Sequence, residues 1–365
     1  MIIESIELKN YRNYENLQLE LSPGTNIFYG DNAQGKTNIL ESVYVCCTTK
    51  SHKGSKDKEM IRFGTDEAHI SMELRRHEVL YKLDMHLRKN KAKGIAINGV
   101  PIRRAGELLG LGNFVFFSPE DLNIIKNGPA ERRRFLDLEL CQLSRVYLHN
   151  LSNYNKVLNQ RNKILKDSAW HPEYLDTLDI WDLQLVQYGK KVIEERDAFV
   201  KRLNGIITDI HRKLTGGAEE ICISYENNTD ASELEEKLAQ GRERDFKMKT
   251  TQTGPHRDDL CFQVNGIDIR KYGSQGQQRT AALSLKLAEI QLVREEIKDS
   301  PVLLLDDVLS ELDRNRQHYL LESIEDIQTL ITCTGIDDFV ENQFELNRVF
   351  QVINGTVEEG KRGPC

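Results

Sequence analysis

The chain has 365 residues, which is more than one ordinary domain contains and enough for two. Apolar residues make up 39% and charged residues 29%, a balance that supports a sizeable core and excludes a disordered chain. No apolar run approaches the roughly 18 residues of a membrane span, so we expect no membrane association. The seven cysteines contain no CxxC pair, which argues against a zinc site or a disulfide framework and favours the cytoplasm.

The formal net charge of −7 is unevenly distributed. Residues 50–104 contain 14 Lys and Arg against 7 Asp and Glu, so this stretch carries +7 and the rest of the chain −14. Such segregation is typical of a protein with one anion-binding surface, although a solvated basic loop region would give the same count.

Alternating apolar residues predict strands at both ends of the chain. Near the N-terminus they occupy residues 2–8 and 17–21, and a short apolar strand at 27–29 follows. Residues 67–100 resemble a β-meander that closes with a tight turn at Asn98-Gly99. The same dipeptide recurs at Asn265-Gly266 and Asn354-Gly355, each beside an alternating segment.

The middle of the chain has helical periodicity instead. A helix start at Pro129 opens an apolar stripe that continues to Leu158, and a second stripe runs from Leu178 to Ile210 after a break at His171-Pro172. Two such stripes predict an antiparallel helical hairpin whose apolar residues pack in a core. We therefore expect a discontinuous head, residues 1–118 and 251–365, with an inserted helical hairpin domain at 119–250.

Residues 30–37, GDNAQGKT, match the phosphate-binding pattern G-x-x-x-x-G-K-[ST]. Gly30 and Gly35 let the backbone curl around a phosphate, Lys36 places a cation between the β- and γ-phosphates, and the Thr37 hydroxyl binds Mg²⁺. An apolar strand precedes the loop and a helix follows it, as this chemistry requires. The predicted ATP-binding loop consists of Gly30, Asp31, Asn32, Ala33, Gln34, Gly35, Lys36 and Thr37.

Residues 302–307, VLLLDD, are an apolar run that ends in two carboxylates. The run predicts a buried parallel strand. At its end Asp306 is placed to hold the magnesium through water, and Asp307 to orient or deprotonate the attacking water. Alone, such a pair also fits a helix N-cap; beside a phosphate loop we interpret it as the second half of a nucleotide site.

A second candidate phosphate-binding turn precedes the long helix expected from residue 281 to about 297. It contains Ser274, Gln275, Gly276 and Gln277. One γ-phosphate does not need two such turns from one chain, so Ser274 and Gly276 are predicted to reach ATP held by another copy. An ordinary Gly-rich helix start is the alternative.

Together these segments resemble the motifs of ABC-type ATPases: Walker A at 30–37, the signature at 274–277, Walker B at 305–307 and a D-loop with Ser310 and Asp313. The helical insertion is similar to that of the SMC branch. More closely, the chain resembles the bacterial RecF family of recombination mediators, in the stretches LKNYRNY (8–14), FSPEDL (117–122), RRRFLD (132–137) and GPHRDDL (254–260). The resemblance implies an α/β fold: an ABC-type P-loop ATPase head, with a mixed sheet flanked by helices, and an inserted all-helical arm.

The resemblance also implies a function. It implies a homodimer that forms on ATP and Mg²⁺, binds duplex and gapped DNA, associates with RecR and RecO, and helps RecA to load, with slow hydrolysis as a switch. Two alternatives remain, an SMC-like structural DNA bridge and the ATPase subunit of a membrane transporter. Asp307 stands where the wider group has glutamate, and the strand 330–334 offers threonine where transporters place a switch histidine. Arg12 and Asn13 either contact nucleotide or take part in a structural salt bridge.

Phosphate contacts require Lys and Arg side chains. No base-reading motif or aromatic stacking platform is evident, so we expect recognition of DNA shape. The segment Arg132, Arg133 and Arg134 has three readings: helix surface, partner contact or DNA contact. The DNA-binding candidates are Lys53, Lys56, Lys58, Arg75, Arg76, Arg88, Lys89, Lys91 and Lys93.

Overall fold

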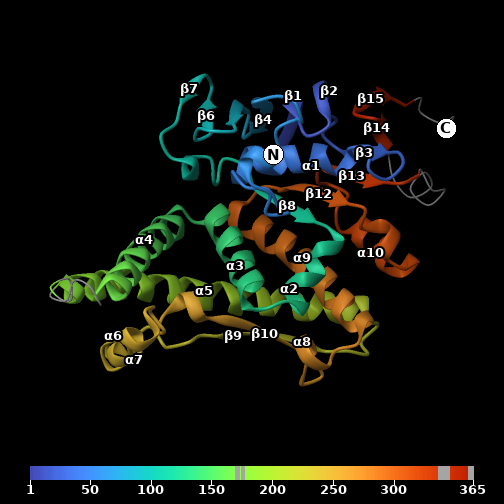
Figure 1. The fold of residues 1–365 in the computed structure, drawn as a ribbon. Coiled ribbons are helices and arrows are strands. Elements are labelled where there is room, and N and C mark those ends of the chain that lie inside the picture. The colour runs from blue at the N-terminus through green and yellow to red at the C-terminus, as the bar shows by residue number, and fades with distance from the viewer. Residues whose placement is uncertain (169–172, 174–176, 336–345, 361–365) are drawn as a thin grey trace. The chain divides into compact units, whose positions relative to one another are not determined.

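The computed structural model describes residues 1–168, 173, 177–335 and 346–360 (Figure 1). The chain divides into two compact units, the first formed by residues 1–121 and 289–365 and the second by residues 122–288. The first boundary lies close to the expected residue 119. The second does not: residues 251–288, which the sequence placed in the head, cluster with the inserted unit.

The first unit contains an antiparallel sheet in the order β2-β1-β4-β5-β6-β7. Its predicted turn at Asn98-Gly99 is confirmed, because both residues have positive φ, 52° and 77°. This is the backbone that a two-residue hairpin requires. The strands are β1 (Ile2–Tyr11), β2 (Tyr14–Glu20), β4 (Glu67–Arg76), β5 (Val79–Arg88), β6 (Gly94–Ile97) and β7 (Val100–Pro101).

A second sheet of this unit has the order β15-β14-β3-β13-β12-β8. All its pairs are parallel except β14 with β15. Strand β3 therefore lies between β13 and β14, which come from the far end of the chain. The strands are β3 (Thr25–Tyr29), β8 (Phe114–Phe117), β12 (Val302–Asp306), β13 (Thr329–Cys333), β14 (Leu346–Ile353) and β15 (Thr356–Glu359).

Helix α1 (Lys36–Thr48) contacts β4 and β5 of the first sheet and β8, β12 and β13 of the second. Eleven of its 13 residues are buried. Because the helix is buried on nearly every side, its sequence has no amphipathic stripe. The remaining elements of the first unit are η1 (Asp57–Glu59), η2 (Ala105–Glu107), η3 (Pro119–Asp121), η6 (Leu309–Glu311) and α10 (Arg314–Glu322).

The second unit is built on the helices α4 and α5, which pack along each other. Arg161 of α4 pairs with Asp182 of α5, while Tyr147 near the start of α4 accepts from Arg196 further along α5. These crossed pairs confirm the predicted antiparallel hairpin. The helices of the unit are α2 (Leu122–Lys126), α3 (Pro129–Leu143), α4 (Arg145–Asp167), α5 (Leu178–Leu214), α6 (Leu234–Gln240), α7 (Arg242–Met248), α8 (Ile269–Tyr272) and the first part of α9 (Gln275–Ile297).

Two expectations about this unit are wrong. The stripe that starts at Pro129 belongs to two helices, because Ser144 adopts extended φ and ψ and its hydroxyl caps α4 by accepting from Tyr147 N. The insertion is also not all-helical, since alternating apolar residues form a strand at 221–226. The antiparallel sheet has the order β11-β10-β9 and contains β9 (Ile221–Glu226), β10 (Asp259–Val264) and β11 (Ile267–Asp268), with η5 (Pro255–Arg257) before β10.

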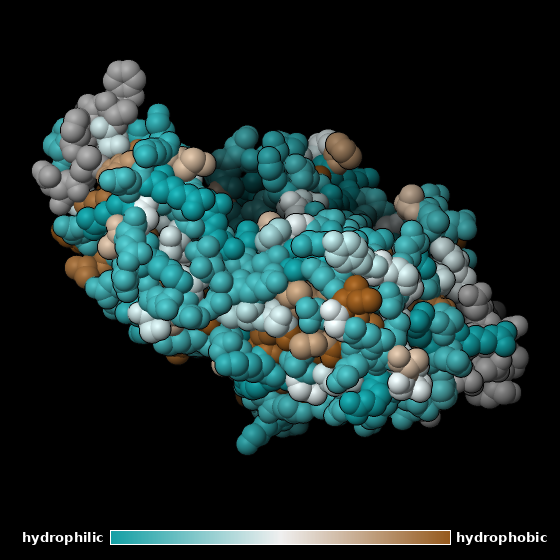
Figure 2. Space-filling view, turned by 90° about the horizontal axis from the view of Figure 1, so that it is seen from below, coloured by the Kyte–Doolittle hydropathy of each residue, from teal (hydrophilic) through white to brown (hydrophobic). Residues whose placement is uncertain are grey.

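Hydrophilic side chains cover most of the face shown in Figure 2, with hydrophobic side chains in small groups between them. Within the described ranges, every helix is too short or too polar to cross a lipid bilayer. None of the six cysteines in this part of the chain forms a disulfide.

Candidate nucleotide-binding site

The predicted phosphate loop connects β3 to α1 in the first unit. Its two glycines adopt left-handed backbone angles, with φ of 149° at Gly30 and 116° at Gly35. A Cβ at Gly30 would lie 2.4 Å from Val352 O, and one at Gly35 would lie 2.4 Å from Asn13 Nδ2. Gly30, which faces backbone, therefore requires glycine for space as well as for conformation, and Gly35 requires it for conformation.

Lys36, the first residue of α1, turns back into this loop. Its side chain is buried, and Nζ donates to Gly30 O at 2.7 Å and to Asp31 O at 3.0 Å. The ammonium group is thus hydrogen-bonded to two carbonyls at the start of the loop, and these bonds stabilise the curled conformation of the loop. A phosphate that enters the loop meets a positive charge that is already in position.

Three polar side chains meet where β12 ends, although they come from distant parts of the sequence. Asp306 Oδ1 accepts from Thr37 Oγ1 and from Thr332 Oγ1, each at 2.8 Å. Burial raises the pKa of Asp306, and the two hydroxyl groups oppose that effect. A hydroxyl and a carboxylate oxygen side by side are the ligands that Mg²⁺ prefers, so this pair fits the metal that accompanies a nucleoside triphosphate.

Asp307 follows the strand with a φ of 53°, which is unusual for a residue with a side chain. Its backbone N–H donates to Thr332 Oγ1 at 2.9 Å, and its carbonyl accepts from Ser310 Oγ at 2.8 Å. Thr332 therefore holds both acidic residues at once. Strained backbone that neighbouring groups hold in place is common at functional sites. Here these bonds fix the backbone position of Asp307, from which its carboxylate extends.

Arg12 and Asn13 have different surroundings, although they are adjacent. Arg12 forms a two-pronged ion pair with buried Glu41, from Nε at 2.8 Å and from Nη2 at 2.7 Å, so the salt bridge considered for it is present. Burial alone would raise the pKa of Glu41, but hydrogen bonds from Arg12 and Ser51 outweigh it and the pKa is lowered. Asn13 instead donates from Nδ2 to Gln34 O at 2.8 Å, at the phosphate loop.

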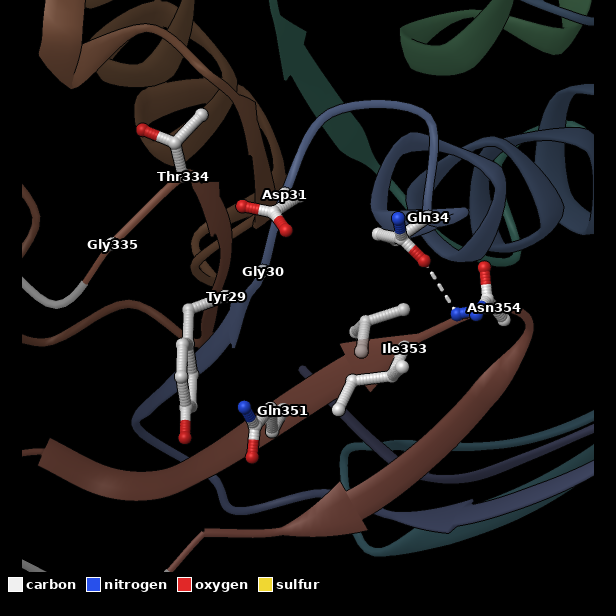
Figure 3. Close-up of a pocket in the computed structure, with 10 residues that line it drawn as sticks. Tyr29, Gly30, Asp31, Gln34, Thr334, Gly335, Gln351, Ile353 and Asn354 are labelled. Carbon is white, nitrogen blue, oxygen red and sulfur yellow. Dashed lines mark hydrogen bonds between the residues drawn. The ribbon is translucent and has the colours of Figure 1, made fainter.

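A cavity of about 500 Å³ opens beside the phosphate loop (Figure 3). Residues 29–31 and Gln34 line it, together with residues 334–335 after β13 and residues 351–354 of the last hairpin. Gln34 Oε1 accepts from Asn354 N at 2.5 Å, and Gly355 N donates to Gln34 O at 3.2 Å. The turn of the last hairpin thus holds the phosphate loop at Gln34, and the cavity lies beside this contact.

The candidate signature residues lie in the second unit, at the start of α9. Ser274 Oγ accepts from Gln277 N at 3.2 Å, and Gln277 Oε1 accepts from Ser274 N at 3.0 Å, a reciprocal cap. Ser274, Gln275 and Gly276 are exposed, and a Cβ at Gly276 would meet Ser274 Oγ at an ordinary contact distance of 3.9 Å. In the first unit, Asp313 caps α10 by accepting from Arg316 N, and the Ser310 side chain is exposed.

The DNA-binding candidates fall into two groups. Arg75 and Arg76 end β4, and Arg76 Nη1 donates to the carbonyls of Gly110 and Leu111. The other group lies at the opposite end of this ten-residue strand, roughly 30 Å away, because Glu67 pairs in register with Arg88. Lys93 joins its two loops by an ion pair to Asp57 at 2.9 Å. We call this second group the basic edge: Lys53, Lys56, Lys58, Arg88, Lys89, Lys91 and Lys93.

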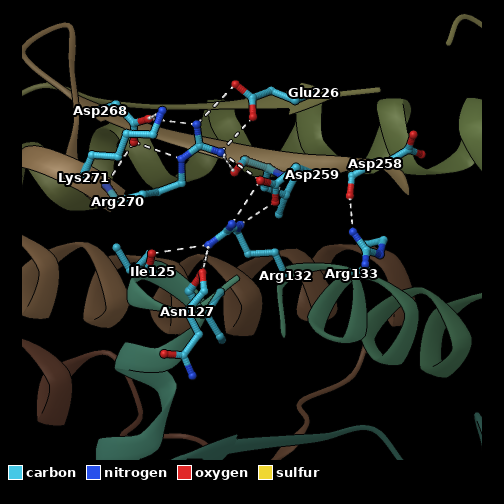
Figure 4. A network of polar contacts seen from close by, with 12 residues as sticks. Ile125, Asn127, Arg132, Arg133, Glu226, Asp258, Asp259, Asp268, Arg270 and Lys271 are labelled. Atoms are coloured by element: carbon cyan, nitrogen blue, oxygen red, sulfur yellow. Dashed lines mark hydrogen bonds and ion pairs between the residues drawn. The ribbon is translucent and has the colours of Figure 1, made fainter. Parts of the chain in front are cut away.

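Of the three adjacent arginines, Arg132 is a structural residue (Figure 4). It is 3% exposed and binds both oxygens of Asp259, at 2.5 and 3.0 Å, and the carbonyl of Asn127 at 2.6 Å. Arg133 donates to Asp258 O at 2.7 Å. For Arg132 none of the three sequence readings is right, because it ties α3 to Asp259, the first residue of β10, within the second unit. Arg133 ties the same helix to Asp258, just before that strand.

The sequence missed two residues that organise the site. Thr332 bridges Asp306 and Asp307, and Glu41 fixes Arg12. Glu41 follows Thr37 by four residues and so shares its helix face, a signal that was available. Nothing in the adjacent sequence distinguishes Thr332 from Thr334 as the residue that contacts the two aspartates.

Comparison with known proteins agrees with this geometry. The family model described as "RecF/RecN/SMC N terminal domain" matches residues 2–358. The chain is 63% identical to the DNA replication and repair protein RecF of Lachnoclostridium phytofermentans, over 99% of this chain and 100% of that one. It is 62% identical to the RecF of Agathobacter rectalis, over 98% and 99%.

Among solved structures, one described as "Structure of the recombination mediator protein RecF-ATP in RecFOR pathway" superimposes with a TM-score of 0.92. Its sequence is 36% identical, and the match covers 98% of this chain and 97% of that one. The two relatives cover 99% and 98% of this chain, and the match to the solved structure covers 98% of it. The chain therefore belongs to the RecF family of SMC-like ABC ATPases.

Proposed function

We propose that this protein binds ATP with Mg²⁺ and uses it to control binding to DNA in recombinational repair. The observation that carries the proposal is the meeting of Thr37, Asp306 and Thr332 beside a glycine-dependent phosphate loop. Lys36 would neutralise the phosphates, and Thr37 and Asp306 would hold the metal. The solved relative described as RecF-ATP supports the choice of nucleotide.

The finer steps are part of the same proposal. ATP draws two copies together, with Ser274 and Gly276 of each completing the site of the other, and Ser310 and Asp313 placed between the heads. Asp307 orients the attacking water, and slow hydrolysis releases the DNA. The basic edge grips duplex near single-strand gaps, and RecR and RecO connect the complex to RecA loading in the cytoplasm. Family membership disfavours the transporter alternative.

A Ser274→Arg variant is expected to stay monomeric with ATP. The bulky arginine side chain would take the place of the serine hydroxyl that is proposed to contact the ATP bound by the other copy. An Asp307→Asn variant should dimerise but hydrolyse ATP about 100-fold more slowly, since it keeps the geometry and loses the base. Sedimentation velocity and phosphate release measure the two effects. Wild-type protein that remains monomeric with ATP at micromolar concentration would refute the composite site.

DNA binding is tested with gapped and blunt duplexes in the presence of ATP, ADP or neither. We expect the tightest binding with ATP on the gapped duplex. The double variant Lys58→Gln/Lys91→Gln removes the charges of two exposed lysines of the basic edge. In a plot of the logarithm of the DNA association constant against the logarithm of the salt concentration, the steepness of the slope should therefore decrease by about two. The matched variant Lys163→Gln/Lys166→Gln, on exposed positions of α4, should keep the slope. Affinities indifferent to nucleotide would exclude the proposed control.

A further inference from the structure

Phe63 is the most exposed large apolar residue among those that the structure describes. Its relative exposure is 101%, against 77% for Tyr272 and 66% for Val100. A single exposed apolar residue is normal at a protein surface and by itself indicates nothing. Two further features distinguish Phe63: its backbone is held in place, and its neighbourhood is strongly basic.

The backbone is held on both sides of the ring. Before it, Ile61 forms a β-bridge with Tyr11, and Arg62 N donates to Asn10 O at 2.9 Å. After it, Thr65 N and Thr65 Oγ1 both donate to Arg62 O, at 3.1 and 2.9 Å, and Gly64 has a φ of 87°. Phe63 thus stands at the tip of a closed turn. Because the backbone is already fixed, binding through the ring restricts only the rotation of the side chain.

The turn is joined directly to the basic edge. Asp66 O accepts from Lys89 N at 3.2 Å, and Asp66 Oδ1 pairs with Lys89 Nζ at 3.0 Å. Residues 50–66 and 88–93 contain nine Lys and Arg against three Asp and Glu. Two of these acids, Asp57 and Asp66, are paired with lysines, so the surroundings of the ring favour a polyanion.

We propose that Phe63 stacks on an exposed base where double-stranded DNA gives way to a single strand. The inference rests on the proposed function and adds a contact to it. An aromatic ring beside phosphate-binding charges is how proteins hold unpaired nucleotides, because every base has a face for stacking. The bases of a continuous duplex are covered by their neighbours, so only a gap or junction offers such a face. The ring therefore supplies a preference for gaps that phosphate contacts do not.

The experiment compares Phe63→Ala with Phe63→Tyr, in the full-length chain with ATP at fixed salt. Affinity of the alanine variant for the gapped duplex should fall about 5- to 150-fold, the range of one base–aromatic stack. Its affinity for blunt duplex should stay within about twofold. The tyrosine variant should bind both substrates like wild type. With 2-aminopurine at the junction, wild type and Phe63→Tyr should quench the fluorescence on binding and Phe63→Ala should not.

Val100→Ala is the matched control, since it removes another exposed apolar side chain from the same unit. A Phe63→Ala variant that binds both duplexes like wild type, or weakens both alike, would overturn the inference. So would a loss of affinity for ATP itself, which would assign the ring to the nucleotide. Wild type that binds DNA under the control of ATP but without gap preference overturns the stacking contact and leaves the proposed control of DNA binding by ATP standing. Wild type that binds no DNA refutes the proposed function and this inference together.

Discussion

A Lys36→Met variant is expected to bind ATP about 10- to 100-fold more weakly than wild type. Lys36 is 4% exposed and points into the loop that it closes. Methionine keeps most of its volume but removes the charge, and hydrogen bonds to charged groups contribute about 1.5–3 kcal/mol each. The variant also leaves the carbonyls of Gly30 and Asp31 without their donor, so the empty loop should relax. Titration with a fluorescent ATP analogue measures the effect.

The control for this variant is Lys50→Met, which removes an exposed lysine just beyond the other end of α1. It should bind ATP like wild type. Thermal unfolding of both variants separates a loss of affinity from a loss of structure. A folded Lys36→Met protein with unchanged affinity for ATP would show that the loop does not hold the phosphates.

The second large effect is expected far from this site, in the helical hairpin. Arg161→Met should lower the free energy of unfolding by about 3–5 kcal/mol, the usual result of breaking a buried ion pair. Arg161 is 0% exposed and binds Asp182 at 2.5 Å, Asp245 at 2.6 Å and the Thr251 hydroxyl at 2.8 Å. Asp182 keeps a second partner in Arg242, but Asp245 is left buried with its charge unpaired.

Urea unfolding monitored by tryptophan fluorescence tests this, because Trp181 lies on α5 beside Asp182. Lys163→Met is the matched control: it changes an exposed residue of the same helix, two positions along, and should shift stability by less than about 0.5 kcal/mol. If the Arg161→Met protein unfolds at the same urea concentration as the control, the buried cluster does not stabilise the hairpin.

Sequence reasoning succeeded where the relevant signal is local. The phosphate loop, the apolar strand before Asp306 and the Asn-Gly turns each depend on a few adjacent residues, and the structure contains the strands and turns as expected. It failed where a long-range contact decides. Ser144 ends one helix and caps the next, although the apolar stripe continues across it in register. Arg132 has the sequence context of a surface residue, and only its contact with the distant Asp259 shows that it is buried. Likewise, only the register of β4 with β5 separates Arg75 and Arg76 from the basic edge.

The order of strands around the phosphate loop has a consequence for synthesis of the chain. Strand β3 is made within the first thirty residues, yet its neighbours in the sheet begin at Thr329 and Leu346. The hairpin that supports Gln34 is completed only at residues 354–355. While the ribosome is still producing the intervening segments, β3 lacks both of the strands with which it pairs. The phosphate loop likewise lacks the hairpin turn that contacts Gln34. The nucleotide site is thus assembled last, although its phosphate loop emerges first.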